Sequence, residues 1–264
     1  MIRFVDSPAR GADLEKVLAG EDLIHACMLS SYYNGSRKVG KDLRFWVCYE
    51  GEEPRAALLS IYDEVLLCDH GLLETDELEE FLRFLNCRVL CGRGPLLRRL
   101  APGAGLRVDE LAPAMVYRGG ALTANEPAFL PVEENFSGLY QMIRENYDHF
   151  FDCGGYEGWL ADYRFKRLDG VCQIYAYCED GAPVATGALT CASGRCADLG
   201  GIVVRRDHRG QGLGRRMVRF LIARAQEHRR TPVLCCAGEK LLGYYQRLGF
   251  EPFDEWACAL AENT

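Results

Sequence analysis

The sequence predicts an α/β fold with a mixed, mostly antiparallel central sheet, flanked by helices and built from two related halves. The first observation is that apolar residues alternate between helix-type and strand-type spacing along the second half of the chain. The second is a fainter copy of the same order in the first half. The third is the composition, since the 264 residues are 48% hydrophobic and 26% charged, as in ordinary globular proteins.

The elements of the second half follow from this spacing. Leu139, Met142 and Ile143 recur at helical intervals, and Asp180-Gly181 supplies the chemistry of a hairpin turn. One apolar stripe on a later helix consists of Leu213, Met217, Leu221 and Ala225. The expected elements are helices over 135–150 and 156–168, strands over 171–178, 184–191 and 196–204, a helix over 213–228, a strand over 232–236, a helix over 240–247 and a last strand over 256–260.

The first half repeats this order in weaker form. Its expected elements are strands over 45–50 and 55–62, a helix over 76–85, a strand over 88–91 and a helix over 96–100. Pro127 and Pro131 discourage regular structure between the halves, so we expect a boundary near 127, with domains 1–126 and 127–264. The alternative is that the repeat is accidental and the first half is an unrelated α/β domain.

Composition excludes several classes of function. The 31 basic and 38 acidic residues give a net charge of −7, which argues against a nucleic-acid partner. No apolar run is long enough to span a membrane, and the start of the chain lacks a signal-peptide pattern. The 13 cysteines lie mostly in apolar runs without metal-binding spacing, so we expect free structural thiols, no metal and a reducing cytoplasm.

The most informative stretch runs from the end of the strand over 196–204 into the helix over 213–228. Glycines 210, 212 and 214 expose backbone N–H groups at a helix N-terminus, which favours binding of an anion such as a phosphate. Their spacing fits neither the G-x-G-x-x-G nor the G-x-x-x-x-G-K-[ST] phosphate loop. It does fit R-x-x-G-x-G, read at Arg209, Gly212 and Gly214.

This motif resembles the acetyl-CoA loop of the GNAT superfamily of N-acetyltransferases. Tyr245, Gly249 and Phe250 resemble the family's late Tyr-x-x-x-Gly-Phe segment, and the resemblance covers roughly residues 135–255. It implies an acyl-CoA-dependent N-acyltransferase, with acetyl-CoA as the expected cosubstrate. The acyl group would pass by direct attack in a ternary complex to a primary amine on a small molecule or peptide.

The resemblance also implies the site residues. The cofactor-binding residues would be Ile202, Val203, Val204, Arg209, Gly210, Gln211, Gly212, Leu213, Gly214 and Arg215. Arg209 and Arg215 are the arginines best placed to contact phosphate. Tyr245 would protonate the departing thiolate, unless it is only a packing aromatic. Gly238 stands where many members have an asparagine, so a side-chain contact to the pantetheine arm of the cosubstrate is in doubt.

Two carboxylates are candidates for the base that deprotonates the amine. Asp198 lies on the same strand as Val204 at even spacing, so both could face the cleft, and Glu157 lies on the second helix. Solvated surface carboxylates are the alternative for both. His149, Phe150, Phe151, Gly154, Gly155 and Tyr156 are candidates for the wall of the amine pocket, or else core aromatics at a helix break.

Two rival functions stay open at this point. One is a non-catalytic acyl-CoA-binding or interaction protein that keeps the fold, and the other is a nucleic-acid module that uses the nine arginines between 205 and 230. We expect the first half to be catalytically silent, because its corresponding turn over 68–76 carries acidic residues and one glycine. The identity of the acceptor and the oligomeric state are not indicated by the sequence.

Overall fold

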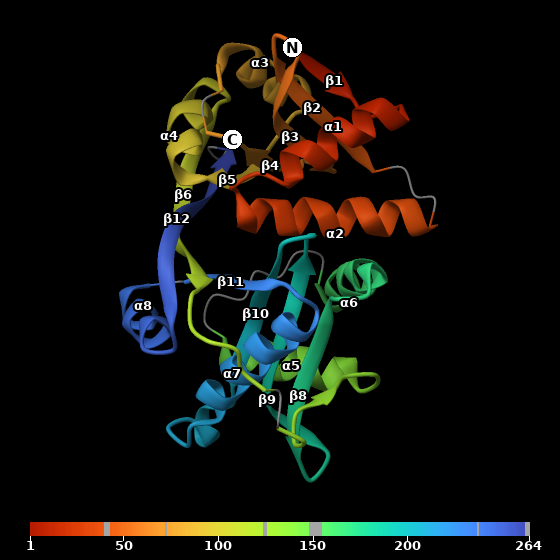
Figure 1. The fold of residues 1–264 in the computed structure, drawn as a ribbon. Coiled ribbons are helices and arrows are strands. Elements are labelled where there is room, and N and C mark those ends of the chain that lie inside the picture. Colours follow the sequence, from red (N-terminus) through yellow and green to blue (C-terminus); the bar gives the residue numbers. More distant parts are fainter. Residues whose placement is uncertain (40–42, 72, 124–125, 148–154, 237, 262–264) are drawn as a thin grey trace.

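The structure, a computed structural model, describes residues 1–264 except 40–42, 72, 124–125, 148–154, 237 and 262–264. Within these residues, 12 strands form one continuous sheet. Helices lie on the faces of this sheet, and one long helix crosses between its upper and lower parts (Figure 1).

Both halves of the chain have the same order of elements. The first half contains β1 (Ile2–Phe4), α1 (Pro8–Leu18), α2 (Leu23–Val39), β2 (Arg44–Glu50), β3 (Glu53–Ile61), β4 (Glu64–Asp69), α3 (Asp76–Phe84), β5 (Val89–Arg93), α4 (Gly94–Gly103) and β6 (Leu106–Tyr117). The second half contains β7 (Leu130–Pro131), α5 (Phe136–Asn146), α6 (Gly155–Lys166), the 3-10 turn η1 (Arg167–Asp169), β8 (Gln173–Glu179), β9 (Ala182–Ala192), β10 (Cys196–Val204), the 3-10 turn η2 (Arg206–His208), α7 (Leu213–Glu227), β11 (Thr231–Cys235), α8 (Glu239–Gln246) and β12 (Phe250–Ala261).

The strand pairing repeats as well. In each half the first four strands pair antiparallel in sequence order, and the fourth and fifth, β4 with β5 and β10 with β11, pair in parallel. The predicted α/β fold with a mixed, mostly antiparallel sheet is confirmed. Among the predicted elements of the second half, two differ most in extent. α5 ends at Asn146 instead of residue 150, because Tyr147 is extended, and the last strand begins at Phe250 because it pairs with β6 along its length.

The last strand of each half completes the sheet of the other half. The order of the sheet is β1-β2-β3-β4-β5-β12-β6-β11-β10-β9-β8-β7, so β12 lies beside β5 and β6 lies beside β11. Figure 1 shows β12 running from the lower part of the molecule to the upper part. The division into domains 1–126 and 127–264 stays a prediction, and this exchange means that neither half has all its strands without the other.

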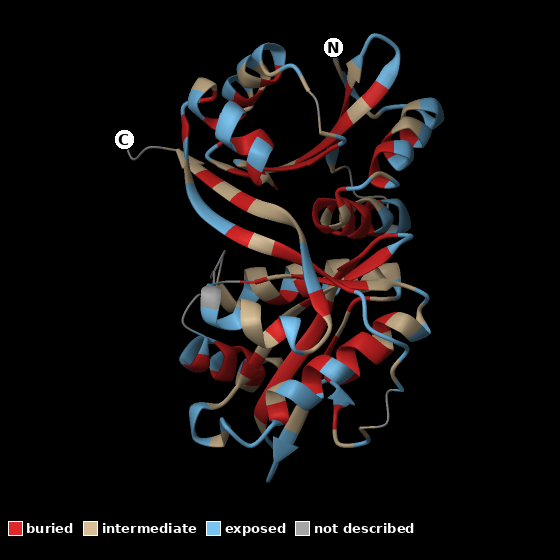
Figure 2. Ribbon diagram, turned by 60° about the vertical axis from the view of Figure 1, so that its left-hand side comes forward, coloured by how far each residue is buried: buried red, intermediate tan, exposed pale blue. Residues whose placement is uncertain are grey.

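The buried residues gather along the strands and on the helix faces that meet them (Figure 2). The predicted apolar stripe on α7 is buried at all four positions, where it packs against β9, β10 and β11. α2, from the first half, packs against β9 and β10 of the second half. There Ser31 is fully buried, and its hydroxyl contacts the backbone of Ala192 and the carboxylate of Asp169.

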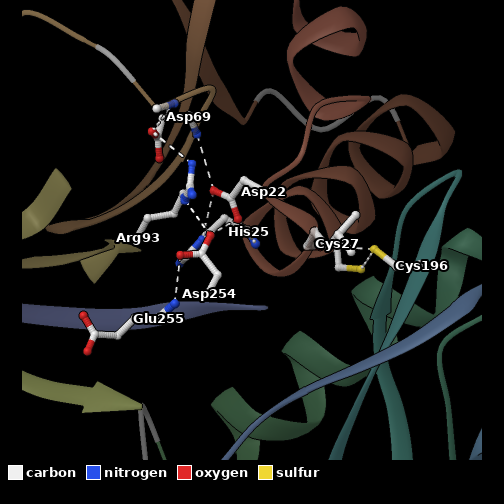
Figure 3. A network of polar contacts seen from close by, with 10 residues as sticks. Asp22, His25, Cys27, Asp69, Arg93, Cys196, Asp254 and Glu255 are labelled. Carbon is white, nitrogen blue, oxygen red and sulfur yellow. Dashed lines mark hydrogen bonds and ion pairs between the residues drawn. The ribbon is translucent and has the colours of Figure 1, made fainter. Parts of the chain in front are cut away.

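The cysteines of the described residues are free, and most of them are buried. Two of these thiols meet between α2 and β10, where the Sγ atoms of Cys27 and Cys196 lie 2.7 Å apart (Figure 3). A second pair, Cys91 and Cys258, lies between β5 and the exchanged strand β12, with 3.7 Å between the Sγ atoms. The thiols therefore act as small packing groups where the halves meet.

A buried charged network lies at the ends of β4 and β5 (Figure 3). Asp22, beside the start of α2, contacts Nδ1 of His25 at 2.8 Å, and its Oδ2 accepts the backbone N–H of Asp69 at 3.4 Å. Arg93 lies 3.8 Å from the Asp69 carboxylate and 2.6 Å from that of Asp254 on β12. The network therefore connects the first half to the strand it receives from the second.

The pKa of Asp69 in this network is raised to about 6, first by burial and then by the negative charge of Asp22. The N–H of Gly71, Arg93 and His25 oppose this shift. Because the pKa in the folded state lies above the ordinary value, ionisation of Asp69 destabilises the fold. The contribution of protonated Asp69 to the free energy of unfolding is fully present at low pH, and it is lost as the pH rises from about 4 to above 6.

We therefore predict that Asp69→Asn stabilises the protein at pH 7.5, by up to about 3 kcal/mol, and that the gain disappears near pH 4. Denaturant unfolding at a series of pH values measures this difference. Asp254→Asn is the contrasting variant, because it removes the closer partner of Arg93 and should destabilise at pH 7.5. An Asp69→Asn protein less stable than the wild type at pH 7.5 would show that the Asp69 charge is favourable.

Candidate active site

The site begins where two parallel strands of the second half separate. β10 and β11 pair from Cys196–Thr231 to Asp198–Val233, and β10 then continues to Val204 without β11 beside it. The N–H groups that β10 turns toward β11 beyond this point have no partner on that strand. The sheet therefore opens between the two strands at this point.

A cleft of about 970 Å³ lies at this opening. Its lining residues come from the ends of α5 and β10, the glycine-rich loop over 205–212, the start of α7, and α8: Asn146, Tyr147, Ile202, Val203, Val204, His208, Arg209, Gly210, Gly212, Leu213, Gly214, Arg215, Lys240, Leu241, Tyr244 and Tyr245. The cleft brings together the predicted cofactor-binding residues apart from Gln211. Tyr245, the predicted acid, lines the same cleft.

The glycine-rich loop leads into α7 without a side-chain cap. Gly210 and Gly212 have φ angles of 78° and 82°, a conformation that strains other residues, and Gly212 is the N-cap of α7. Because Gly212 has no side chain, no capping group occupies the N–H groups of the first turn. A built Cβ at either glycine meets no atom within 4 Å, so the backbone is open to a ligand.

Arg209 is held by backbone oxygens. Its Nε donates to the carbonyl of Val204 at 3.0 Å, and its Nη2 donates to the carbonyl of Asn146 at 2.6 Å. The predicted phosphate-binding arginine therefore also fixes the loop to the ends of β10 and α5.

His208 adds a titratable group to the wall of the cleft. Its Nδ1 lies 2.7 Å from Asp207 Oδ1 and its Nε2 lies 3.0 Å from Glu179 Oε2. The hydrogen bond to Asp207, and then that to Glu179, raises the pKa of His208. The charged imidazolium is thus favoured, but two carboxylates already neutralise it.

Tyr245 lies in the cleft and is 9% exposed. Its ring packs edge-on against Tyr244 and Phe250, with centroids 5.2 Å and 5.8 Å away. Burial raises the pKa of Tyr245 well above its ordinary value, so the phenol keeps its proton at neutral pH. Both the packing and the acid interpretations of Tyr245 are therefore compatible with its position.

The even spacing of Asp198 and Val204 does not place them on one face. Between Gly200 and Val203, β10 advances by three residues while β9 advances by two, which is a β-bulge. Leu199 accordingly packs with α7, whereas Val203 packs with α5. The expectation that Asp198 and Val204 face the same side is therefore wrong, because the bulge inverts the alternation.

Asp198 is partly buried and lies within reach of the charge of Lys166, the last residue of α6. Its carboxylate accepts a hydrogen bond from the Thr190 hydroxyl and lies 3.9 Å from the Cys191 Sγ. Burial raises the pKa of Asp198, while Thr190 and the charge of Lys166 oppose the increase. Asp198 is thus a carboxylate of raised basicity at the last residue pair before β10 and β11 separate.

The other predicted residues are less informative. Glu157 is exposed in the first turn of α6 and does not line the cleft. His149, Phe150, Phe151 and Gly154 lie outside the described residues.

Several lining residues were missed by sequence reasoning. Asn146 and Tyr147 lie where α5 ends, and no glycine or proline in the sequence indicates that end. Lys240 and Leu241 precede Tyr245 by about one helical turn, so the spacing of α8 could have predicted them.

The corresponding place in the first half differs in charge. β4 and β5 pair as far as Leu66–Cys91 and then separate, as β10 and β11 do. The first turn of α3, which corresponds to α7, carries Asp76, Glu77 and Glu79. Negative side chains thus replace the glycines that leave the N-terminus of α7 open, and they oppose binding of an anion.

Residues 136–250 match the model of the acetyltransferase (GNAT) family. This segment contains the cleft residues, the glycine-rich loop and Tyr245. This part of the chain is similar to that family. The predicted resemblance is therefore confirmed for the second half.

Solved structures of the same fold cover the whole chain. An acetyltransferase from the GNAT family of Colwellia psychrerythraea is 14% identical with a TM-score of 0.55, and the match covers 100% of both chains. A tandem GNAT protein from the clavulanic acid biosynthesis pathway is 15% identical with a TM-score of 0.58, also over 100% of both chains. A GCN5-related N-acetyltransferase from Kribbella flavida is 17% identical with a TM-score of 0.60, over 89% of this chain and 96% of that one.

At these identities the structures establish the fold alone. No curated protein matches the sequence. Among the described residues, no group of three or more His, Cys, Asp and Glu side chains is arranged to hold a metal ion. In the same residues, no helix combines the length and apolar character needed to cross a membrane.

The open backbone at Gly212 yields a direct prediction. Gly212→Val places a branched side chain where a phosphate would approach the start of α7, so we expect CoA affinity to fall at least about tenfold. Isothermal titration calorimetry with CoA measures the loss.

Gly181→Val is the matched control for strain. Gly181 has a φ of 79° in the turn between β8 and β9, and a built Cβ there also meets no atom within 4 Å. The control should lose similar stability but bind CoA like the wild type. Undiminished affinity in a folded Gly212→Val protein would rule out this loop as the phosphate site.

Proposed function

We propose that this protein is an acyl-CoA-dependent N-acyltransferase that moves acetyl from acetyl-CoA to a primary amine on a small molecule or peptide. The observation that carries the proposal is the opening between β10 and β11 beside the uncapped N-terminus of α7, within the segment that is similar to the GNAT family. Acetyl-CoA is the donor that the family uses, and the acceptor is proposed only as a chemical class.

The glycine-rich loop would hold the pyrophosphate through backbone N–H groups at the start of α7. Arg215, exposed in the first turn of α7 and lining the cleft, would add a charged contact. The pantetheine arm would enter the opening beside β10, where backbone N–H groups lack a partner on β11. One of these, near Val204, would bind the oxygen of the thioester as negative charge develops on it.

The chemistry would be a direct transfer. The amine nitrogen forms a bond to the thioester carbonyl carbon, and the carbon–sulfur bond breaks with its electron pair going to sulfur. Asp198 accepts one proton from the ammonium form of the amine before the attack, and Tyr245 donates its phenolic proton to the sulfur. The resulting phenolate takes the remaining proton from the attacking nitrogen, so the products are an amide, free CoA thiol and a protonated Asp198. Holding both reactants in one cleft contributes further, because a bimolecular step becomes effectively unimolecular.

Asp198 is favoured over Glu157 as the base. It lies where the strands separate, and burial raises its pKa toward that of an effective acceptor of protons at neutral pH. Neither carboxylate is among the residues that line the cleft, and Glu157 is exposed. The preference for Asp198 therefore rests on its place in the strand and on the direction of its pKa.

We propose that the first half does not bind acyl-CoA. The acidic first turn of α3 and the buried network of Asp69 and Arg93 occupy the positions of the phosphate loop and of the opening. α2 packs against β9 and β10, so the first half would act as a wall of the catalytic half. The expected compartment is the cytoplasm, where the thiols stay reduced.

The arginines of α7 give little support to a nucleic-acid module. Arg216 lies 2.7 Å from Glu126, and Arg224 forms an ion pair with Glu227. These acidic partners neutralise part of the positive charge that the arginines give to α7.

A screen for release of CoA thiol tests the proposed reaction. Acetyl-CoA is incubated with amines, aminoglycosides and peptides, and Tyr245→Phe is compared with the wild type on the best acceptor. The variant keeps the ring and its packing but cannot donate a proton, so kcat should fall about 10²–10⁴-fold with little change in CoA affinity.

Tyr244→Phe is the control on the neighbouring ring and should reduce kcat much less. Equal turnover of wild type and Tyr245→Phe would reject Tyr245 as the acid. Binding of CoA without transfer to any acceptor class would favour the non-catalytic rival.

The base is tested by the pH dependence of Asp198→Asn. At neutral pH we expect kcat/KM to fall about 10²-fold or more, because the amine arrives protonated and has no acceptor for its proton. The loss should shrink as the pH rises past the pKa of the amine, because the neutral form then predominates. A constant loss across this pH range would indicate that Asp198 has a structural role only.

A further inference from the structure

The Arg209 side chain joins two elements at the edge of the cleft. Its guanidinium bridges the carbonyl of Val204, the last residue of β10, and the carbonyl of Asn146, the last residue of α5. A cation at the C-terminus of a helix is favourable, because the last carbonyls have no intrahelical partner. Two of its five N–H groups are used in this way.

Asn146 holds the same loop through a second contact. Its side chain is 7% exposed, and its Oδ1 accepts the backbone N–H of Arg206 at 2.9 Å. Its Nδ2 donates to the carbonyl of Met142, one turn earlier in α5, at 2.8 Å. The amide is therefore satisfied on both sides and fixed in one orientation.

Asn146 thus contacts the loop at two points. The side-chain oxygen holds Arg206 near the start, and the main-chain oxygen holds Arg209 just before the first glycine. The backbone between these contacts includes η2, and the glycines that follow depend on where Arg209 is held. Loss of a buried acceptor would leave the Arg206 N–H without this partner and free the loop to move.

We propose that Asn146 is a positioning residue that, with Arg209, holds the glycine-rich loop in the shape that binds acyl-CoA. The expected effect of Asn146 on CoA affinity rests on the proposed function. The expected effect of Asn146 on the position of the loop does not rest on it. In this account Arg209 acts first as a tie between α5 and β10, and any contact with phosphate uses its remaining N–H groups.

The test compares Asn146→Ala with Asn146→Asp. The alanine variant loses both side-chain hydrogen bonds, whereas aspartate keeps an acceptor for the Arg206 N–H. We expect Asn146→Ala to weaken CoA binding about tenfold and to raise the KM for acetyl-CoA similarly, with kcat and the acceptor KM unchanged. Asn146→Asp should keep hydrogen exchange of the loop close to that of the wild type and restore part of the affinity, because its negative charge beside the loop opposes the anionic ligand. A general loss of packing would not be rescued in this way.

Gln141→Ala is the matched control on the same helix. Gln141 is exposed, and among the described residues its amide donates to Glu145 at 2.9 Å, one turn later in α5. This variant should bind CoA like the wild type. Arg209→Lys is the second variant, because lysine keeps the charge but lacks the rigid fork that directs Nε and Nη2 to the two carbonyls. It should lose about as much affinity as Asn146→Ala.

Hydrogen exchange of the ligand-free proteins separates this proposal from the proposed function. Peptides covering 205–212 should exchange faster in Asn146→Ala than in the wild type or in Gln141→Ala. Unchanged exchange in Asn146→Ala, or wild-type CoA affinity in Arg209→Lys, would overturn the positioning role. If the wild type binds no CoA, the proposed function fails, and the exchange rates still decide whether Asn146 holds the loop.

Discussion

The pairing of β6 with β12 is the interaction on which the rest of the structure depends. These two long strands pair along their length, and each completes the sheet of the opposite half. Because backbone hydrogen bonds across a buried sheet must be satisfied, neither half can move away without leaving the edge of β5 or β11 open. The Arg93–Asp254 ion pair and the Cys91–Cys258 contact lie on the same exchanged strand. The two halves therefore act as one structural unit around a shared centre.

Within this unit only one of two similar openings is suited to an anionic ligand. Both β4–β5 and β10–β11 separate after a short parallel pairing. In the first half the opening is filled by charged side chains such as Asp69, and the following helix begins with acidic residues. In the second half glycines precede α7, and the buried phenol of Tyr245 faces the cleft. A difference in charge and side-chain volume thus distinguishes two halves that share one topology.

The sequence predicted the parts whose signals are local. The bounds of β10 and the apolar stripe of α7 follow from spacing alone, and the glycines at 210, 212 and 214 indicated the loop. It could not predict the exchange of β6 and β12, because antiparallel pairing between strands so far apart leaves no local pattern. The bulge near Gly201 likewise inverted the expected side of Val204 relative to Asp198. The Asn146 contacts depend on where α5 ends, which its apolar period does not specify.

Calorimetric titration of the intact chain with CoA tests the central claim most directly, because it asks whether the opening in the second half is the binding site. The account predicts one site per chain, with affinity that falls as salt screens the phosphate contacts. Two equivalent sites would show that the first half retains a working cleft despite the acidic residues of α3. No binding at all would contradict the assignment of the β10–β11 opening to an acyl-CoA.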